Sequence, residues 1–242
     1  MKFTFGIITT KENQTHEHNS DNHLSEIIDS IRKNNIPQGS YEIIIVGGDN
    51  IYQNDKDIKH IDFDDVKNPR WITKKKNLIT KHAKFENIVF SHDYIKYDSG
   101  WYKGFLEFGN DWDICMCINQ AYEGHRFRDW LAWDDPDLCY DVDGYKHRIA
   151  LVPYDYKKTQ YMQISGFWWL AKKHVMERDP LDEKMRWGDA EDVEWSFQVR
   201  DKYKYVMNTN SIVNTLKSKR LSAYYVEGDD VYINNDWLIR YK

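Results

Sequence analysis

The sequence predicts an α/β fold: a central, mostly parallel sheet with helices on both faces. In the first half of the chain, short apolar and β-branched segments alternate with segments of helical periodicity. One of them, 43–46, has four apolar residues in succession, as expected of a strand covered on both faces. The 242 residues contain no repeat, low-complexity tract or linker. We therefore expect a single domain over residues 1–242.

The first three elements are a strand, a helix and a second strand. Residues 3–10 (FTFGIITT) are short, apolar and β-branched, and a charged loop follows them. A helix is predicted from residue 24 to about Asn34, shortly before Pro37. The second strand lies within 41–50 (YEIIIVGGDN), and the β-α-β order implies a right-handed connection. The apolar residues of the helix recur at i, i+3, i+4 and i+7: Leu24, Ile27, Ile28 and Ile31.

Four further elements complete the first half and lead into the second. A short strand is predicted at 58–63, a helix that begins at Thr73, a strand at 87–95 and a helix at 99–108. On the first of these helices, one side is expected to carry Leu78, Ile79 and His82.

The second half is predicted to add strands and one helix, part of them in a smaller antiparallel unit. Strands are expected at 113–120, at 161–173 and at 203–209, and a helix at 189–203.

Composition excludes several classes of partner. The net charge is −5, and Lys is mixed with Asp and Glu along the chain, so a nucleic-acid partner is not expected. The N-terminal apolar run reaches polar residues too soon for a signal peptide or a membrane span. A soluble, cytoplasmic protein is the resulting expectation.

Two short patterns suggest metal binding but have simpler interpretations. Cys115 and Cys117 alternate along a predicted strand, which favours buried, inert thiols, and Cys139 lies in a polar segment without an evident disulfide partner. The run from His16 through His18 to His23 could ligate zinc, but a polar loop before a helix explains it more simply.

Polar residues follow three of the predicted strands. They are Thr9 and Thr10 after the first strand, 47–50 after the second, and 91–93 after the fourth. Because ligands bind at the carboxyl ends of strands in open α/β sheets, these residues should converge on one crevice. The chain has neither a P-loop nor a dinucleotide-binding glycine motif. A nucleotide would have to be held in another way.

The segment Ser91-His92-Asp93 is a candidate for holding a nucleotide, because it follows an apolar strand and a Lys-rich helix. Here the chain resembles the inverting GT-A glycosyltransferases, of the large family 2 type, in which an acidic D-x-D motif ends the fourth strand. The resemblance implies that Asp93 binds a divalent cation, Mn²⁺ or Mg²⁺, on the diphosphate of a UDP- or GDP-sugar. Such cations often take only one or two carboxylates. The chain departs from the motif at Ser91, where the first acidic residue would stand.

Other residues match positions that the family places around the donor. Lys76 and Asn77 correspond to its basic/Asn pair, although a solvated helix face is the alternative. Asp49 corresponds to an acidic residue after the second strand. Gly166 corresponds to a glycine beside the donor sugar, or else marks a bulge. The donor site implied by the resemblance comprises Thr9, Thr10, Asp49, Lys76, Asn77, Ser91, His92, Asp93 and Gly166.

A second motif lies in 186–200 (RWGDAEDVEWSFQVR). Asp189 or its neighbour is expected to cap the helix, and the carboxylates of the first turns could serve the helix dipole alone. The segment nevertheless resembles the W-G-x-x-E-D-x-E/D motif of inverting GT-A enzymes. The resemblance implies that Asp192 is the catalytic base of a hexosyltransferase-like enzyme and that Glu191 assists it. The acceptor-binding residues that it implies are Trp187, Gly188 and Trp195.

The resemblance implies a nucleotide-binding half over 1–98 and an acceptor-binding, catalytic half over 99–242. The acceptor would be a glycan, a protein or a small molecule in glycan biosynthesis. The aromatic and acidic stretch from Trp130 through Trp133 to Tyr140 is either an acceptor loop or core packing. Two other functions stay open: a metal-dependent nucleotide-sugar hydrolase, and a noncatalytic sugar-binding module.

Overall fold

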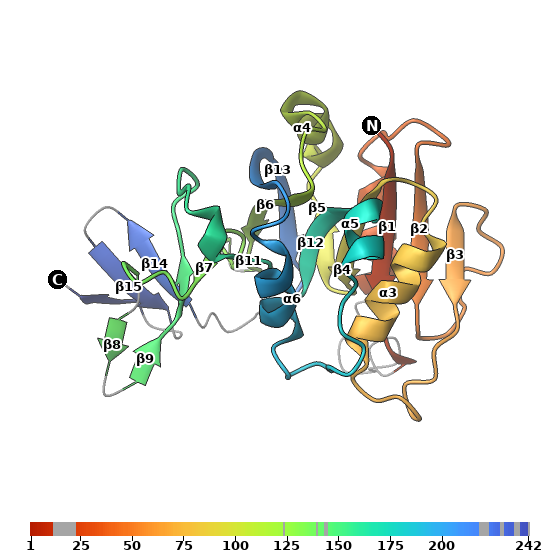
Figure 1. Ribbon diagram of the computed structural model, residues 1–242. Helices are drawn as coiled ribbons and strands as arrows, with labels where there is room; N and C mark the ends of the chain where they lie inside the picture. The colour runs from red at the N-terminus through yellow and green to blue at the C-terminus, as the bar shows by residue number, and fades with distance from the viewer. Residues whose placement is uncertain are drawn as a thin grey trace.

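A large mixed sheet and a smaller sheet form the molecule (Figure 1). The structure is a computed structural model, and it describes residues 1–11, 23–122, 124–138, 140–142, 145–217, 223–227, 230–234 and 238–241. The large sheet has eight strands in the order β3-β2-β1-β4-β12-β6-β13-β5. Their bounds are β1 Phe3–Ile8, β2 Tyr41–Val46, β3 Ile58–Ile61, β4 Asn87–His92, β5 Ile95–Tyr97, β6 Ile114–Gln120, β12 Trp168–Lys172 and β13 Tyr205–Thr215.

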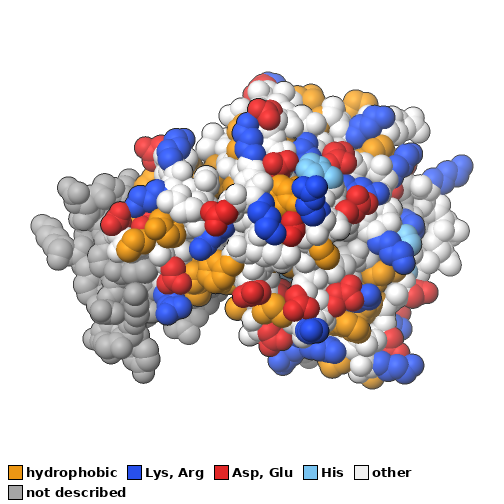
Figure 2. Space-filling model, viewed as in Figure 1, with side chains coloured by type: hydrophobic (Ala, Val, Ile, Leu, Met, Phe, Trp, Pro, Cys, Tyr) orange, Lys and Arg blue, Asp and Glu red, His pale blue; other side chains and the backbone are white. Residues whose placement is uncertain are grey.

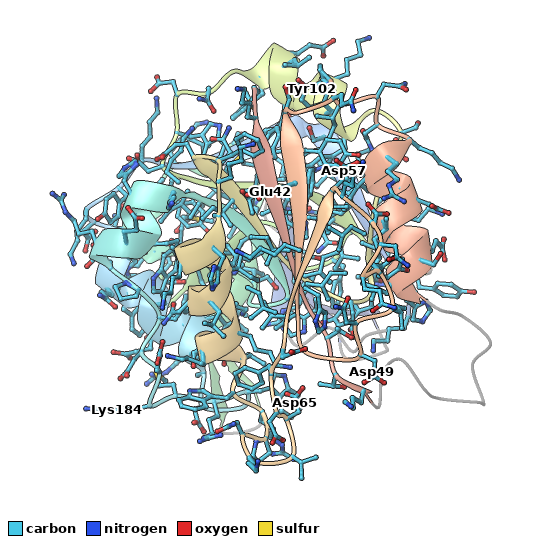
Figure 3. The ribbon with its side chains drawn as sticks, turned by 90° about the vertical axis from the view of Figure 1, so that its right-hand side faces the viewer. Glu42, Asp49, Asp57, Asp65, Tyr102 and Lys184 are labelled. Carbon is cyan, nitrogen blue, oxygen red and sulfur yellow. The ribbon has the colours of Figure 1, made fainter. Side chains whose placement is uncertain are left out.

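Most pairings in the large sheet are parallel, as predicted. β1 pairs in parallel with both β2 and β4, and β2 pairs in parallel with β3. β12 runs antiparallel to β4 and β6, and β13 returns to the parallel direction beside β6. The carboxyl ends of β1, β2 and β4 therefore share one edge. Figure 3 shows Asp49 and Asp65 at this edge and Glu42 and Tyr102 toward the opposite one.

The smaller sheet has six strands in the order β11-β7-β10-β14-β15-β16, and β8 and β9 form a separate pair. All its pairings are antiparallel except that of β10 with β14. The bounds are β7 Leu131–Trp133, β8 Tyr140–Val142, β9 Tyr145–His147, β10 Ile149–Leu151, β11 Met162–Gln163, β14 Ala223–Glu227, β15 Asp230–Asn234 and β16 Leu238–Tyr241. The predicted combination of a mostly parallel sheet with a smaller antiparallel part is confirmed.

Helices cover both faces of the large sheet. α2 and α3 lie on opposite faces of its parallel strands (Figure 3), and α2 buries the four apolar residues that its sequence pattern predicted. α4 packs against β13, and α6 packs against β11. The helices are α2 His23–Arg32, α3 Ile72–His82, α4 Trp101–Phe108, α5 Lys173–Arg178 and α6 Glu191–Val199, with one 3-10 turn, η1, at Thr159–Tyr161.

The buried side of α3 differs from the prediction. Of the three residues expected on one side, only Ile79 is buried, whereas Lys75 and Lys76 are almost fully buried. The lysine stems pack in the interior because each ammonium reaches an oxygen acceptor there: Lys75 Nζ lies 2.6 Å from Thr9 O, and Lys76 Nζ lies 2.6 Å from Gly166 O. The helix turn that carries them is therefore not a solvated face.

The strand predicted at 161–173 is interrupted. Its first part, β11, joins the smaller sheet and its second part, β12, joins the large one. Between them the chain turns, with Trp168 N donating to Ser165 O at 3.1 Å. Gly166 lies in this turn. Apolar residues stand on both sides of the turn because both strands are buried, and periodicity alone cannot show a change of sheet.

The thiols of β6 behave as predicted, and the other proposed metal ligands are only partly described. Cys115 and Cys117 are buried and free, and burial raises the pKa of both thiols. His16, His18 and Cys139 lie outside the described residues. Among the residues that the structure describes, no three His, Cys, Asp or Glu side chains gather as a set of metal ligands.

On the described part of the face shown in Figure 2, Lys and Arg side chains are interspersed with Asp and Glu, without a large patch of one sign. Within the described ranges, no helix has the length and apolar character needed to cross a bilayer.

Gly47, directly after β2, can be tested as a position that only glycine fits. Its φ is +87°, and a Cβ there would lie 2.4 Å from Thr9 O and 2.7 Å from Lys75 Nζ. Gly39 also has a positive φ, +76°, but nothing lies within 4 Å of its Cβ position. We expect G39A to cost about 1 to 2 kcal/mol of unfolding free energy, and G47A roughly 1 to 3 kcal/mol more because of overpacking. Urea unfolding of both variants measures the difference, and equal losses would contradict the close packing at Gly47.

Candidate active site

Two clefts adjoin at the edge where β1, β2 and β4 end. The large cleft, of about 1120 Å³, is lined among others by Thr10, Asp49 and Asp93. The small cleft, of about 560 Å³, is lined among others by Gly166 and Asp192. Some residues line both clefts, so molecules bound in the two would lie next to each other. These shared residues are His92, Tyr94 and Trp187.

Asp93 lies in the wall of the large cleft, directly after β4. Thr9 Oγ1 donates to Asp93 Oδ2 at 2.7 Å, and both residues are buried. The parallel register of β1 and β4 places Ile8 beside His92, so the next residue of each strand meets the other. The register thus explains why residues 84 apart in sequence form this contact.

The chemistry of this position fits a hard divalent cation that a phosphate ligand helps to hold. Asp93 supplies carboxylate oxygen, the ligand type that Mg²⁺ and Mn²⁺ prefer. Mg²⁺ is commonly held by one or two carboxylates, with phosphate and water oxygens in its other positions. Asp93 is the described residue that would hold such an ion.

Positive groups line the large cleft as well. Lys75 Nζ lies 2.7 Å from Asp65 Oδ1 in addition to its contact with Thr9 O. Burial lowers the pKa of Lys75, while Asp65 and Asp93 oppose that shift. Lys11, Arg70 and Lys217 also line the large cleft. These cations can contact the phosphates of an anionic ligand.

Asp192 lies in the first turn of α6, where two backbone groups hold its carboxylate. Gly166 N donates to Oδ2 at 2.9 Å, and Val193 N donates to Oδ1 at 3.0 Å. A Cβ on residue 166 would lie 2.9 Å from Asp192 Oδ2, so the carboxylate fills the space that a side chain would take. Gly166 therefore makes room for Asp192 within the small cleft.

The N-terminus of α6 is built differently from the prediction. Its N-cap is Ala190, in the left-handed region with φ 59°, and no side chain caps it. Asp189 instead accepts a hydrogen bond from Arg186 N at 2.8 Å. The N-cap is thus the neighbour of Asp189, and it caps the helix without a side-chain hydrogen bond. Glu191 and Asp192 remain in the first turn of the helix, at the positive end of its dipole.

Lys76 and Glu191 form a buried pair behind Asp192. Lys76 Nζ donates to Gly166 O at 2.6 Å and lies 4.0 Å from Glu191 Oε1. Burial raises the pKa of Glu191, against the nearby ammonium, and burial lowers the pKa of Lys76, against Glu191 and Asp192. Because Lys76 lines neither of the two clefts, its place is to support the Gly166 backbone rather than to face a nucleotide.

Asn77 also supports the site from behind. Its Nδ2 donates to Leu181 O at 2.9 Å, and Leu181 N donates to its Oδ1 at 3.2 Å. One turn earlier in α3, Thr73 Oγ1 donates to Met185 O at 2.7 Å. One edge of the helix thus holds the segment that leads into Trp187 and α6. Lys76 and Asn77, the basic/Asn pair of the sequence, thus contact other parts of the protein and line neither cleft.

The structure brings most of the other predicted residues to the two clefts, but not Thr9, Ser91 and Trp195. Ser91 Oγ donates to His92 O at 2.8 Å and lines neither cleft. Trp195 is buried in the core, where its Nε1 donates to Asp179 O and its ring contacts Trp169. Thr9 lies behind Asp93. Lining at least one cleft are Thr10, Asp49, His92, Asp93, Gly166, Trp187, Gly188, Glu191 and Asp192.

The candidate acceptor stretch is divided between core and cleft. Trp130 is buried against Tyr205, at 5.3 Å between ring centroids, whereas Trp133 lines the small cleft. The side chain of Tyr140 lies outside the described part of the chain.

Several cleft residues had no signal in the sequence. Whether Lys75 or Lys76 faces the cleft depends on the rotational phase of α3, and the polar sequence of this helix does not define that phase. Arg128, Gln163 and Ser165 line the small cleft but belong to no motif. A half-buried arginine can be recognised as part of a site only once its neighbours are known.

Several solved structures have a similar architecture. S. aureus TarS matches with a TM-score of 0.60 and 13% identity, over 90% of this chain and 37% of that one. A shorter TarS chain in complex with UDP-GlcNAc matches with a TM-score of 0.59 and 14% identity, over 93% and 62%. GalNAc-T7 with UDP, GalNAc and Mn²⁺ matches with a TM-score of 0.61 and 13% identity, over 90% and 44%. The chain has the GT-A fold.

At these identities the likeness shows the fold alone, and the chain spans less than two thirds of the length of these structures. No protein-family profile matches the chain, and no curated protein does. In this GT-A fold, the large cleft lies at the carboxyl ends of the parallel strands, where open α/β sheets bind their ligands.

Proposed function

We propose that the protein is a glycosyltransferase that moves a sugar from a nucleoside-diphosphate donor to an acceptor hydroxyl. The observation that carries this proposal is the pair of adjoining clefts, with Asp93 in the large one and Asp192 in the small one. Transfer between two molecules requires a site for each and close contact between their reacting atoms. The UDP and UDP-GlcNAc complexes among the similar structures support a UDP-sugar as donor.

The donor is proposed to occupy the large cleft. Asp93 would hold Mn²⁺ or Mg²⁺, which when bound neutralises charge on the diphosphate leaving group. Thr9 fixes the orientation of the Asp93 carboxylate. Lys75 is in turn fixed by Thr9 O and Asp65, so its ammonium stays beside the phosphates. Thr10, Asp49 and the shared residue His92 complete the proposed donor site.

The acceptor is proposed to occupy the small cleft, with Asp192 as the base. A carboxylate that accepts the hydroxyl proton as the oxygen attacks the anomeric carbon gives inversion in a single step. Gly166 N and Val193 N hold the carboxylate, and each of its oxygens keeps a further lone pair for the acceptor. Glu191 positions this turn through its pairing with Lys76. Trp187 and Gly188 line the acceptor side.

Release of nucleoside diphosphate tests the proposal. The protein is incubated with UDP- and GDP-sugars and Mn²⁺, with and without a mixture of sugar and glycoside acceptors, and free diphosphate and product masses are measured. We expect release from one donor that depends on an acceptor and gives a product heavier by one sugar. Acceptor-independent release would instead indicate a hydrolase. Nucleotide binding without release under any condition would indicate a noncatalytic module.

A further inference from the structure

The small cleft contains a cation that neither sequence motif includes. Arg128 lies between β6 and β7 and lines this cleft but not the large one. Its Nε is buried without a hydrogen-bond partner, and no ion pair joins its guanidinium to any residue that the structure describes. Burial lowers the pKa of Arg128, and the charge of Asp192 opposes that shift. A buried N–H of a charged group without a hydrogen-bond partner is costly, so a ligand that accepts from it would relieve that cost.

The backbone holds Arg128 in an uncommon conformation that its neighbours enforce. Its φ is 47°, in the left-handed region that side chains other than glycine adopt rarely. The next residue, Asp129, is fully buried and accepts hydrogen bonds from Trp130 N at 2.7 Å, Tyr154 OH at 2.8 Å and Arg126 Nε at 2.8 Å. This network fixes the chain beside Arg128. The backbone from which the Arg128 side chain enters the cleft lining is therefore held in place.

Other polar atoms of the same cleft also lack partners. Gln163 Oε1 and Ser165 Oγ belong to residues with 1% exposure, and neither atom has a hydrogen-bond partner among the described residues. They can bond hydroxyl groups of a bound sugar. Trp133 and Phe167 add apolar surface to the same cleft. The lining thus combines sugar-compatible groups with one unpaired positive charge.

We propose that the acceptor carries an anionic group, a phosphate or a carboxylate, and that Arg128 binds it in the small cleft. This inference rests on the proposed function, because it takes the small cleft as the acceptor site. The planar guanidinium matches both anions in a two-pronged geometry that a neutral hydroxyl does not offer. An anion there also balances the charge of Arg128, which Asp192 approaches without forming an ion pair.

Binding measurements test the proposal without requiring turnover. Calorimetry with saturating UDP and Mn²⁺, which keeps phosphate probes out of the large cleft, is run with glucose 6-phosphate, methyl β-D-glucuronide and neutral methyl β-D-glucoside. We expect at least one anionic probe to bind about 10- to 100-fold more tightly than the neutral one, as for a charge-assisted contact. The tighter of the two anionic probes tells phosphate from carboxylate.

Three variants make the test specific. R128Q should remove the preference for anions, and R128K should restore part of it because it keeps the charge but not the two-pronged geometry. The control R200Q, at an arginine that stacks on Phe197 outside both clefts, should keep the preference. The inference is overturned if R128Q binds the anionic probes as the parent does, or if R128Q weakens UDP binding instead. Failure of the parent to bind UDP would count against the proposed function, separately from the result for Arg128.

Discussion

Replacing Asp192 with Asn should reduce turnover by about 10² to 10⁴-fold, or roughly 3 to 5 kcal/mol of transition-state stabilisation, with donor binding unchanged. The amide cannot accept the acceptor's proton. Both carboxylate oxygens accept backbone hydrogen bonds, from Gly166 and Val193, and an amide oxygen can replace only one of them. We therefore also expect a loss of about 1 kcal/mol of stability. Steady-state kinetics, UDP calorimetry and thermal melting measure the three quantities.

Glu194→Gln is the matched control. Glu194 lies in the same helical turn as Asp192 but is exposed and lines neither cleft. The E194Q substitution removes the same charge from the same helix terminus as D192N does, so an effect of the helix dipole alone would appear in both variants. Turnover of D192N within a few-fold of the parent, or an equal loss in E194Q, would refute the assignment of Asp192 as the base.

Replacing Asp93 with Ala should remove the dependence of nucleotide binding on Mn²⁺. The substitution deletes the carboxylate proposed to hold the ion, and it leaves Thr9 Oγ1 with only its longer contact to Thr10 O, at 3.4 Å. We expect UDP affinity in Mn²⁺ to fall to the metal-free level of the parent protein, and turnover to fall with it. Loss of one partner of a buried hydrogen bond should also cost about 1 to 3 kcal/mol of stability. Calorimetry with and without EDTA reads the metal dependence directly.

Asp64→Ala provides the comparison for Asp93. Asp64 also lines the large cleft, but its carboxylate pairs with Lys67 at 3.1 Å at the exposed rim. Removal of a negative charge there changes the local field without removing a metal ligand. If D93A retains the metal dependence of the parent, or if D64A loses it equally, Asp93 is not the residue that holds the ion.

The sequence predicted the framework of the site well because strand ends are set by local pattern. The apolar runs before Thr9 and Asp93 define two parallel strands, and their register brings the two residues together. The turn at Gly166 was not predicted, because apolar residues on both sides of it are typical of a single strand. Neither was the start of α6 at a left-handed Ala190, since no residue type signals that conformation.

The roles of residues that depend on helix phase or on neighbours distant in the chain could not be predicted from the sequence. Lys76 and Trp195 both lie in motifs that match the family, yet the structure buries both away from the clefts. Lys75, one residue earlier, lines the large cleft instead. Successive helical residues are rotated by about 100°, so neighbouring lysines point to different sides of the helix. A Lys-rich turn has no apolar stripe that would indicate which lysine points toward the cleft.

The contact of Lys76 with Gly166 has a consequence for protein engineering. The hydrogen bonds run from α3 through the Gly166 backbone to the carboxylate of Asp192, so a helix near the start of the chain sets the geometry of a group near its end. A chimera that joins residues 1–98 of this protein to the second half of a distant GT-A enzyme would keep Lys76 but replace both Gly166 and Asp192, so the hydrogen bond from Lys76 would have to form with a foreign backbone. Changing side chains of the small cleft would leave these hydrogen bonds in place, and it is therefore the better route to a different acceptor under the proposed function.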